Sequence, residues 1–210
     1  MSYAHMFYGV DVAALKKLAG SGDEAFVEAF LADPPEDFAE LDLSDLAPAE
    51  ALRRIVAGTA HQDGPEHAAT YGYVLKSVCG YLTRKDGDGY AGLLDGEAAC
   101  LEDLPFALRL PGSGPPVPIP YDEADFPEIG YLEHHEIDAE LAALAAPPGR
   151  PKKPPLKLRI FAWLFQKRTG VVLNSLRTPD AEEVAEEVEE YRNALNDAKA
   201  RGTGVVSFRH

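Results

Sequence analysis

An apolar segment rich in aromatic residues opens the chain, and a second apolar segment closes it. Residues 3–10 contain no helix cap, and residues 204–208 follow a glycine that ends a helical pattern. Both segments are typical of β-strands, while most of the chain between them has helical spacing. The strict strand–helix alternation of a doubly wound nucleotide-binding fold is missing. We therefore expect a single α+β domain over residues 1–210, with a small sheet that includes the N- and C-terminal strands and is covered by several helices.

Helix caps and apolar periodicity place the helices. Asp11 predicts the N-terminal cap of the first helix, and Ser21 with Glu24 three residues later has the spacing of a capping box for the second. Pro48 is typical of a first helical position. The last helix has an apolar stripe at helical spacing, formed by Val184, Val188, Tyr191, Leu195 and Ala198. We expect helices over residues 12–18, 21–33, 48–58, 64–84, 137–146 and 179–201.

Glycine and proline indicate loops in the middle of the chain. Residues 85–92 contain three glycines and are predicted to be an exposed loop. Residues 104–120 contain six prolines, so that only residues 106–110 are suited to an edge strand. Residues 125–132 are expected to lead directly into the helix that contains Ile137.

Charge is distributed unevenly along the chain. The net charge is −15, but residues 141–179 contain eight lysines and arginines and no acid, which leaves about −23 on the remainder. The acidity of this remainder, the acidic body, argues against nucleic acid as its partner, because phosphate binding needs clustered basic side chains. Residues 145–178 form a basic, aromatic segment that contains the only tryptophan. Its periodicity fits a helix or a strand.

Three interpretations of the basic segment remain open. It can pack on the domain and pair its bases with the acidic surface. It can bind a protein partner with a buried aromatic anchor, as in many interfaces. It can contact an anionic membrane or nucleic acid through residues 150–177, the only part of the chain suited to this. The candidate binding residues are Trp163, Phe165, Lys157, Arg159, Lys167 and Arg168.

Histidines provide the case for a metal-dependent enzyme. His61, Asp63 and His67 surround Pro65 in a predicted turn, although their spacing matches no metal motif, and Asp63 can instead cap the following helix. In the second cluster, His134 and His135 precede Asp138, and His134 and Asp138 are one turn apart, which allows an orienting hydrogen bond. The same pattern of polar residues is also typical of an ordinary solvated helix start. Convergence of the two clusters would favour a metal-assisted hydrolase that uses His61, Asp63, His67 and His134.

Other features restrict compartment and chemistry. No window approaches the ~20 apolar residues that span a bilayer, and the N-terminus has no signal-peptide pattern, so we expect a cytoplasmic protein. Cys79 lies in an apolar helix and is expected to be buried. No nucleophile elbow or phosphate-binding loop is present, and we expect no cofactor.

Short motifs in order along the chain resemble an actinobacterial family of small acidic proteins that is known only as a domain of unknown function. They lie at residues 1–3, 8–15, 20–25, 51–58, 71–75, 125–132 and 200–208. The resemblance implies one domain from the first strand to the last and carries no activity or catalytic residue. Relative to this pattern, residues 145–178 look like an insertion.

The leading hypothesis is a cytosolic, non-enzymatic protein-binding module. Either the basic segment or the acidic body would form its contact surface. An immunity or antitoxin-like role is one concrete form, because a small acidic protein is electrostatically suited to neutralise a basic toxin. The alternatives are the metal-assisted hydrolase and a membrane or nucleic-acid contact through the basic segment.

Overall fold

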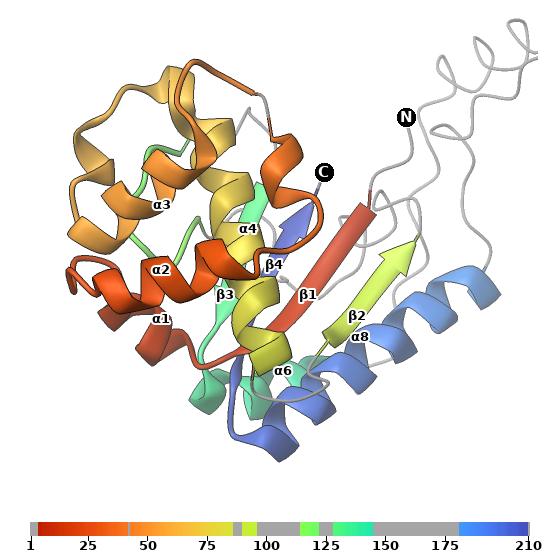
Figure 1. The fold of residues 1–210 in the computed structure, drawn as a ribbon. Coiled ribbons are helices and arrows are strands. Elements are labelled where there is room, and N and C mark those ends of the chain that lie inside the picture. Colours follow the sequence, from red (N-terminus) through yellow and green to blue (C-terminus); the bar gives the residue numbers. More distant parts are fainter. Residues whose placement is uncertain are drawn as a thin grey trace, which may run out of the picture.

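The first and last strands of the chain lie side by side in one antiparallel sheet (Figure 1). The computed structural model describes residues 4–41, 43–85, 90–95, 114–121, 128–144 and 181–209. In these residues the sheet has four strands in the order β2-β1-β4-β3. The strands are β1 (Ala4–Val10), β2 (Tyr90–Asp95), β3 (Glu128–Leu132) and β4 (Gly204–Arg209). The predicted α+β class is confirmed, with both terminal strands at the centre of the sheet.

Strands β2 and β3 were not predicted from the sequence. Strand β2 begins at Tyr90, inside the predicted glycine-rich loop, and pairs with β1, with a register irregularity between Phe7 and Tyr8. Strand β3 occupies residues that were expected to lead into a helix, and it pairs with β4 so that Ile129 lies opposite Phe208. Both are short edge strands, and each pairs with a strand that is distant in sequence. The local sequence pattern of a strand does not predict pairing with a distant strand.

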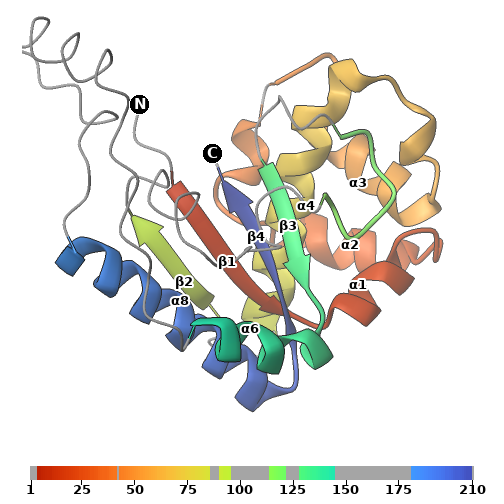
Figure 2. The ribbon, with the colours of Figure 1, turned by 180° about the vertical axis from the view of Figure 1, so that it is seen from behind.

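One face of the sheet is covered by the N-terminal helices, with α4 next to the strands and α2 and α3 outside it (Figures 1 and 2). Tyr8, Val10 and Phe208 contribute to a core with Val74 and Leu75 of α4. The elements on this side are α1 (Val12–Leu18), α2 (Glu24–Ala32), α3 (Pro48–Ala57), α4 (Ala68–Lys85) and the 3-10 turns η1 (Phe38–Glu40), η2 (Ala60–Gln62) and η3 (Pro65–His67).

The opposite face is covered by η4 (His134–Glu136), α6 (Ile137–Leu144) and α8 (Ala181–Arg201) (Figure 2). A second core forms here from Phe7 and Val205 of the sheet and from the helices. Because neighbouring strand residues point to opposite faces, Phe7 lies in the second core and Tyr8 in the first. The predicted apolar stripe of α8 is buried at its described positions, Val188, Tyr191, Leu195 and Ala198.

The helix caps agree with the sequence at α1 and differ at α2. Asp11 Oδ1 accepts a hydrogen bond from Ala14 N at 2.9 Å, as predicted. Helix α2 is capped by Asp23, which accepts from Phe26 N at 3.0 Å, so the predicted cap at Ser21 is wrong. The Ser21 hydroxyl instead accepts from Asp23 N at 3.1 Å and supports the cap residue.

A close backbone approach joins the ends of α1 and α3. Gly58 ends α3 with φ of +76°, a conformation that favours glycine. A Cβ atom at Gly58 would lie 2.8 Å from Gly20 Cα, so neither the backbone conformation nor the space accommodates a side chain. The turn after α1 and the end of α3 are therefore held against each other.

The proline-rich residues 114–121 lie along the outer edge of β3. Gly114 N donates to Ile129 O at 3.0 Å, and Tyr121 OH accepts from Ile129 N at 3.2 Å. Val117 and Ile119 of this segment are buried in the first core. The predicted edge strand at residues 106–110 and the basic segment at residues 145–178 lie outside the described residues. Among the helices that the structure describes, none has the length and apolar character needed to cross a membrane.

Candidate functional site

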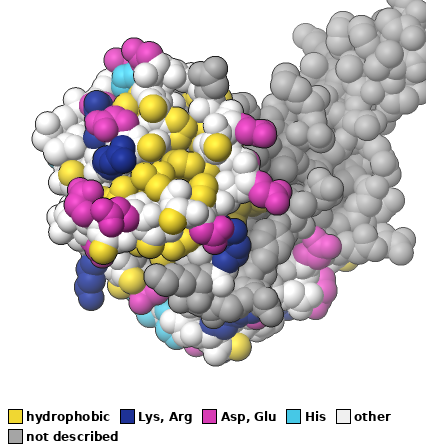
Figure 3. Space-filling model, in the orientation of Figure 1, with side chains coloured by type: hydrophobic (Ala, Val, Ile, Leu, Met, Phe, Trp, Pro, Cys, Tyr) yellow, Lys and Arg dark blue, Asp and Glu magenta, His cyan; other side chains and the backbone are white. Residues whose placement is uncertain are grey.

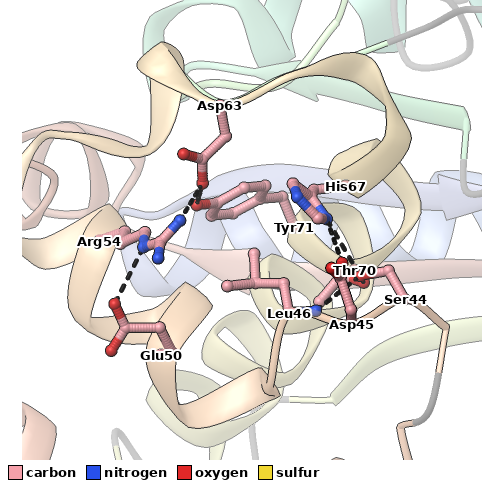
Figure 4. Close-up of polar contacts among 9 residues, drawn as sticks. All are labelled: Ser44, Asp45, Leu46, Glu50, Arg54, Asp63, His67, Thr70 and Tyr71. Atoms are coloured by element: carbon pink, nitrogen blue, oxygen red, sulfur yellow. Dashed lines mark hydrogen bonds and ion pairs between the residues drawn. The ribbon is translucent and has the colours of Figure 1, made fainter.

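The side chain of Ser44 anchors the segment between α2 and α3 (Figure 4). Its hydroxyl is hydrogen-bonded to Thr70 Oγ1 at 2.9 Å and lies 3.2 Å from His67 Nδ1. It also accepts a hydrogen bond from Leu46 N at 3.2 Å. Since Thr70 is buried at the start of α4, these contacts fix residues 43–46 to the helix that covers the sheet.

Asp63 is the centre of a second polar group beside Ser44 (Figure 4). Arg54 Nη1 donates to Asp63 Oδ2 at 2.8 Å, and the Tyr71 hydroxyl donates to the same oxygen. Arg54 Nε also donates to Glu50 Oε1 at 2.9 Å. No side chain caps η3, so the predicted capping role of Asp63 is wrong. Its carboxylate is occupied by Tyr71 and Arg54 instead.

The electrostatics of this group fit a structural role. The hydrogen bonds from Tyr71 and then Arg54 lower the pKa of Asp63 below its ordinary value of 3.8. Burial, followed by the hydrogen bond to Asp63, raises the pKa of Tyr71. At neutral pH the carboxylate is therefore ionised and the phenol is protonated. The group is a stable ion pair with a buried donor, which ties α3 to α4.

The two histidine clusters are not joined by any hydrogen bond or ion pair in the described part of the chain. His67 Nδ1 lies 3.6 Å from Asp45 Oδ1 and contacts Ser44. His134 Nδ1 lies 3.2 Å from Thr203 O. Asp138 pairs with Lys199 at 2.6 Å rather than with His134, so the suggested orienting bond is absent. His61 is exposed, and His135 lies 3.5 Å from Glu133.

The described residues hold no group of three or more His, Cys, Asp or Glu side chains that could bind a metal ion. His61, Asp63, His67 and His134 therefore do not assemble the metal site that the alternative hypothesis requires. Cys79 is fully buried, as predicted, and burial raises the pKa of its thiol. A protonated, buried thiol is not a nucleophile.

A surface that the sequence analysis did not single out lies on α2, the start of α3 and the segment between them. Residues 18–52 contain ten acidic residues and no lysine or arginine. We call the described surface of residues 23–50 the acidic face. Its exposed acidic residues are Asp23, Glu24, Glu28, Asp33, Glu36, Asp37, Glu40 and Asp45. The absence of lysine and arginine over residues 18–52 is visible in the sequence, and it is the signal that could have predicted this surface.

Few cations neutralise the acidic face. Lys76 Nζ lies 3.5 Å from Asp37 Oδ2, and Arg54 contacts Glu50. In the described ranges, no basic side chain forms an ion pair with Glu24, Glu28, Glu36 or Glu40. The exposed carboxylates therefore give this side of the molecule a negative potential.

Hydrophobic side chains gather within the acidic face. Figure 3 shows an apolar area at the centre of the helical side, bordered by acidic side chains and also by some Lys or Arg side chains. Leu43 is the large hydrophobic residue that the described structure leaves exposed, at 48%. Half-buried apolar residues of the same segment are Leu31, Pro34, Pro35 and Leu41. The surface thus combines an apolar centre with a border that contains many acidic and a few basic side chains.

The binding residues predicted in the basic segment lie outside the described residues. They are Trp163, Phe165, Lys157, Arg159, Lys167 and Arg168. Their role stays a prediction, as does the interpretation of residues 145–178 as an insertion.

The chain belongs to the family described as "Domain of unknown function (DUF7691)", whose model matches residues 1–210. This confirms the resemblance to a domain of unknown function that the short motifs indicated. No curated protein and no solved structure matches the chain. The fold and the surface geometry therefore carry the functional argument.

Proposed function

We propose that this chain is a non-enzymatic protein-binding module that binds a positively charged protein through the acidic face. The observation that carries the proposal is the exposed, base-free stretch of acidic residues around an apolar centre. Such a charge distribution attracts a cationic partner over several ångströms and accelerates its association. The apolar centre supplies the area that excludes water once the partner is in contact.

The polar groups beside the face support binding rather than chemistry. Asp63, Tyr71 and Arg54 form contacts with one another, and Ser44 bonds to Thr70 and Leu46. These contacts tie the segment before α3 to α4, and α3 to α4. A preformed surface loses little conformational entropy when a partner binds.

An immunity or antitoxin-like role in the cytoplasm is the concrete form of this proposal that we favour. A basic toxin offers the complementary charge, and a small acidic protein can cover its cationic surface. The basic segment at residues 145–178 is a second candidate contact, for a protein partner or for an anionic membrane or nucleic acid.

The proposal is tested by neutralising the face without changing the rest of the molecule. The variant Glu28→Gln/Glu36→Gln/Glu40→Gln removes three exposed carboxylates that no described cation pairs. The matched control, Glu189→Gln/Glu190→Gln/Asp197→Asn, makes the same charge change on α8, on the other side of the sheet (Figure 2). Partners are captured from the cells that produce the protein, identified by mass spectrometry, purified, and titrated against each variant by calorimetry.

We expect the face variant to weaken binding about tenfold, and more at low salt, because exposed charges at an interface rim contribute modestly and additively. The control should change affinity less than twofold. Equal affinity of both variants and the wild type would contradict the proposal. A deletion of residues 150–177 that alone abolishes binding would move the contact to the basic segment.

A further inference from the structure

Three leucines close together in sequence differ sharply in their environment. Leu41 is half-buried and Leu46 is buried at 7% exposure, and both pack on the first core. Leu43 lies between them with 48% of its surface exposed. Leaving a leucine in water forgoes the stabilisation that its burial would provide. Its side chain is therefore available for contact with a partner.

The backbone that follows Leu43 is anchored by side-chain contacts. Its neighbour Ser44 makes three contacts, to Thr70, His67 and Leu46 N, and Leu46 is inserted in the core (Figure 4). Pro48 then starts α3. A side chain on such an anchored turn is presented in one direction, as hydrophobic anchors of protein interfaces commonly are.

The surroundings of Leu43 define the chemistry of what can cover it. Asp45 follows two residues later with its side chain 92% exposed, and Glu40 precedes it, also exposed. Residues 18–52 contain no basic residue. The occupant must therefore have apolar side chains at its centre and basic side chains at its flanks.

The shape of the face favours a helix as this occupant. In the described residues the face consists of helices and turns, with no strand at its surface, so an extended peptide cannot add to a sheet edge there. An amphipathic helix needs no such edge. Its apolar row can lie on the apolar area while lysines and arginines on both sides reach the carboxylates.

We infer that Leu43 is the hydrophobic anchor of the acidic face and that it binds a cationic amphipathic helix of the partner protein. This inference rests on the proposed function and adds the residue and the class of ligand. Leu43 packs between apolar side chains of the helix, and the surrounding carboxylates select basic flanks over acidic ones.

The test uses the full chain and a defined probe. The probe is an 18-residue peptide of leucine and lysine with leucines at helical spacing. The control peptide has the same composition in an order that distributes the leucines around the helix. The variants are Leu43→Ser, the face variant Glu28→Gln/Glu36→Gln/Glu40→Gln, and Ala142→Ser as a control at an exposed site on α6. Affinity is measured by calorimetry and the contact is mapped by amide chemical shifts.

We expect the patterned peptide to bind at least about tenfold more tightly than the control peptide. Leu43→Ser should weaken it about tenfold, Ala142→Ser should not, and the shifts should centre on residues 43–47. Because Leu43 is exposed, Leu43→Ser should melt within a few degrees of the wild type, which excludes unfolding as the cause.

Three results would overturn the inference. Unchanged affinity of Leu43→Ser is the first, and shifts centred on α8 are the second. The third is self-association of the wild-type chain, if Leu43→Ser abolishes it. That result would mean that the apolar area binds a second copy of the chain. If the face variant loses the natural partner while Leu43→Ser retains it, the inference fails and the proposed function stands. If neither variant affects the natural partner, the proposed function fails.

Discussion

The acidic side chains on the two sides of the sheet differ in how far they are paired with basic side chains. On the α6–α8 side, three described acidic residues are paired with nearby bases, while Glu190 is exposed and forms no ion pair with a described base. Asp138 contacts Lys199 at 2.6 Å, Asp197 contacts Arg201 at 3.0 Å, and Glu189 contacts Arg192. On the α2–α3 side, residues 18–52 contain no base at all, and the described bases that form ion pairs with their carboxylates are Lys76, Arg54 and His67.

This difference is the reason that we propose the α2–α3 side, rather than the α6–α8 side, as the binding surface. Pairs of opposite charge along a helix contribute a little stability and leave no strong potential. A run of like charges does the opposite, because those carboxylates that form no helix cap and no ion pair repel one another. The α2–α3 side therefore carries a feature that folding alone does not favour, and a cationic partner gives it a physical reason.

The largest effect is expected for Phe30→Ala in the first core. The Phe30 ring is fully buried and packs against Phe38, with ring centroids 4.9 Å apart, and against Tyr81 at 5.0 Å. Its removal leaves a cavity and should cost about 3–5 kcal/mol of unfolding free energy. Urea unfolding measures this loss, and hydrogen exchange shows where protection falls.

The same variant tests whether the two sides are independent. Both cores pack on one sheet, with Phe7 and Tyr8 of β1 pointing to opposite sides. We expect amide protection to fall in α4 and α8 together, and Leu195→Ala in the second core to do the same. Protection lost only around α2 and α4 would show that the two sides unfold separately, against the expected single domain.

The elements that the sequence predicts are those with local determinants. Asp11 caps α1 through its own carboxylate, and Pro48 and Gly58 bound α3 through their backbone preferences. Gly202 ends α8 with φ of +72°. The presence of β1 and β4 in one sheet was also expected, because both ends of the chain have strand composition. In each case the information lies within a few residues.

The missed elements depend on distant contacts. Strands β2 and β3 contain Gly92 and Gly130, which weaken a strand pattern, and they form because β1 and β4 offer partners. At α2, two polar residues compete for one cap, and the sequence does not tell Ser21 from Asp23. Register and cap choice are settled by packing.

The candidate site divides in the same way. The absence of lysine and arginine from residues 18–52 can be read from the sequence, although the histidine clusters and the basic segment are the more conspicuous patterns. The exposure of Leu43 cannot be counted, because Leu41, Leu43 and Leu46 have equivalent surroundings in sequence. In the structure, Leu41 and Leu46 pack on the first core, and Ser44 bonds to Thr70 and to Leu46 N, while Leu43 faces outward.

An intermediate effect is expected for Tyr71→Phe, which tests the support of the acidic face. The variant removes the phenol that donates to Asp63 and should cost about 1–2 kcal/mol, since a buried hydrogen bond to a charged group is lost. Thermal or urea unfolding at pH 7 measures it. Tyr81→Phe is the control, because Tyr81 is half-buried and its ring contacts remain in phenylalanine.

The cost of Tyr71→Phe should depend on pH. The pKa of Asp63 is lowered in the folded state by Tyr71 and Arg54, so the stability it contributes is present above its unfolded value of 3.8 and is lost as the pH falls through the folded value. The difference between wild type and Tyr71→Phe should therefore shrink when unfolding is measured below pH 3.8. A difference that stays constant over this range would mean that Asp63 does not accept this hydrogen bond as an ionised group.

The smallest effect is expected for Lys199→Ala on the α8 side. Lys199 and Asp138 are 49% and 73% exposed, so water screens their ion pair and its loss should cost less than about 0.5 kcal/mol. Partner affinity should not change, because the pair lies on the side of the sheet away from the acidic face. A cost above about 1 kcal/mol, measured by urea unfolding, would show that the paired charges hold α6 to α8. A loss of partner affinity would place the contact on the α6–α8 side and would contradict the assignment of binding to the acidic face.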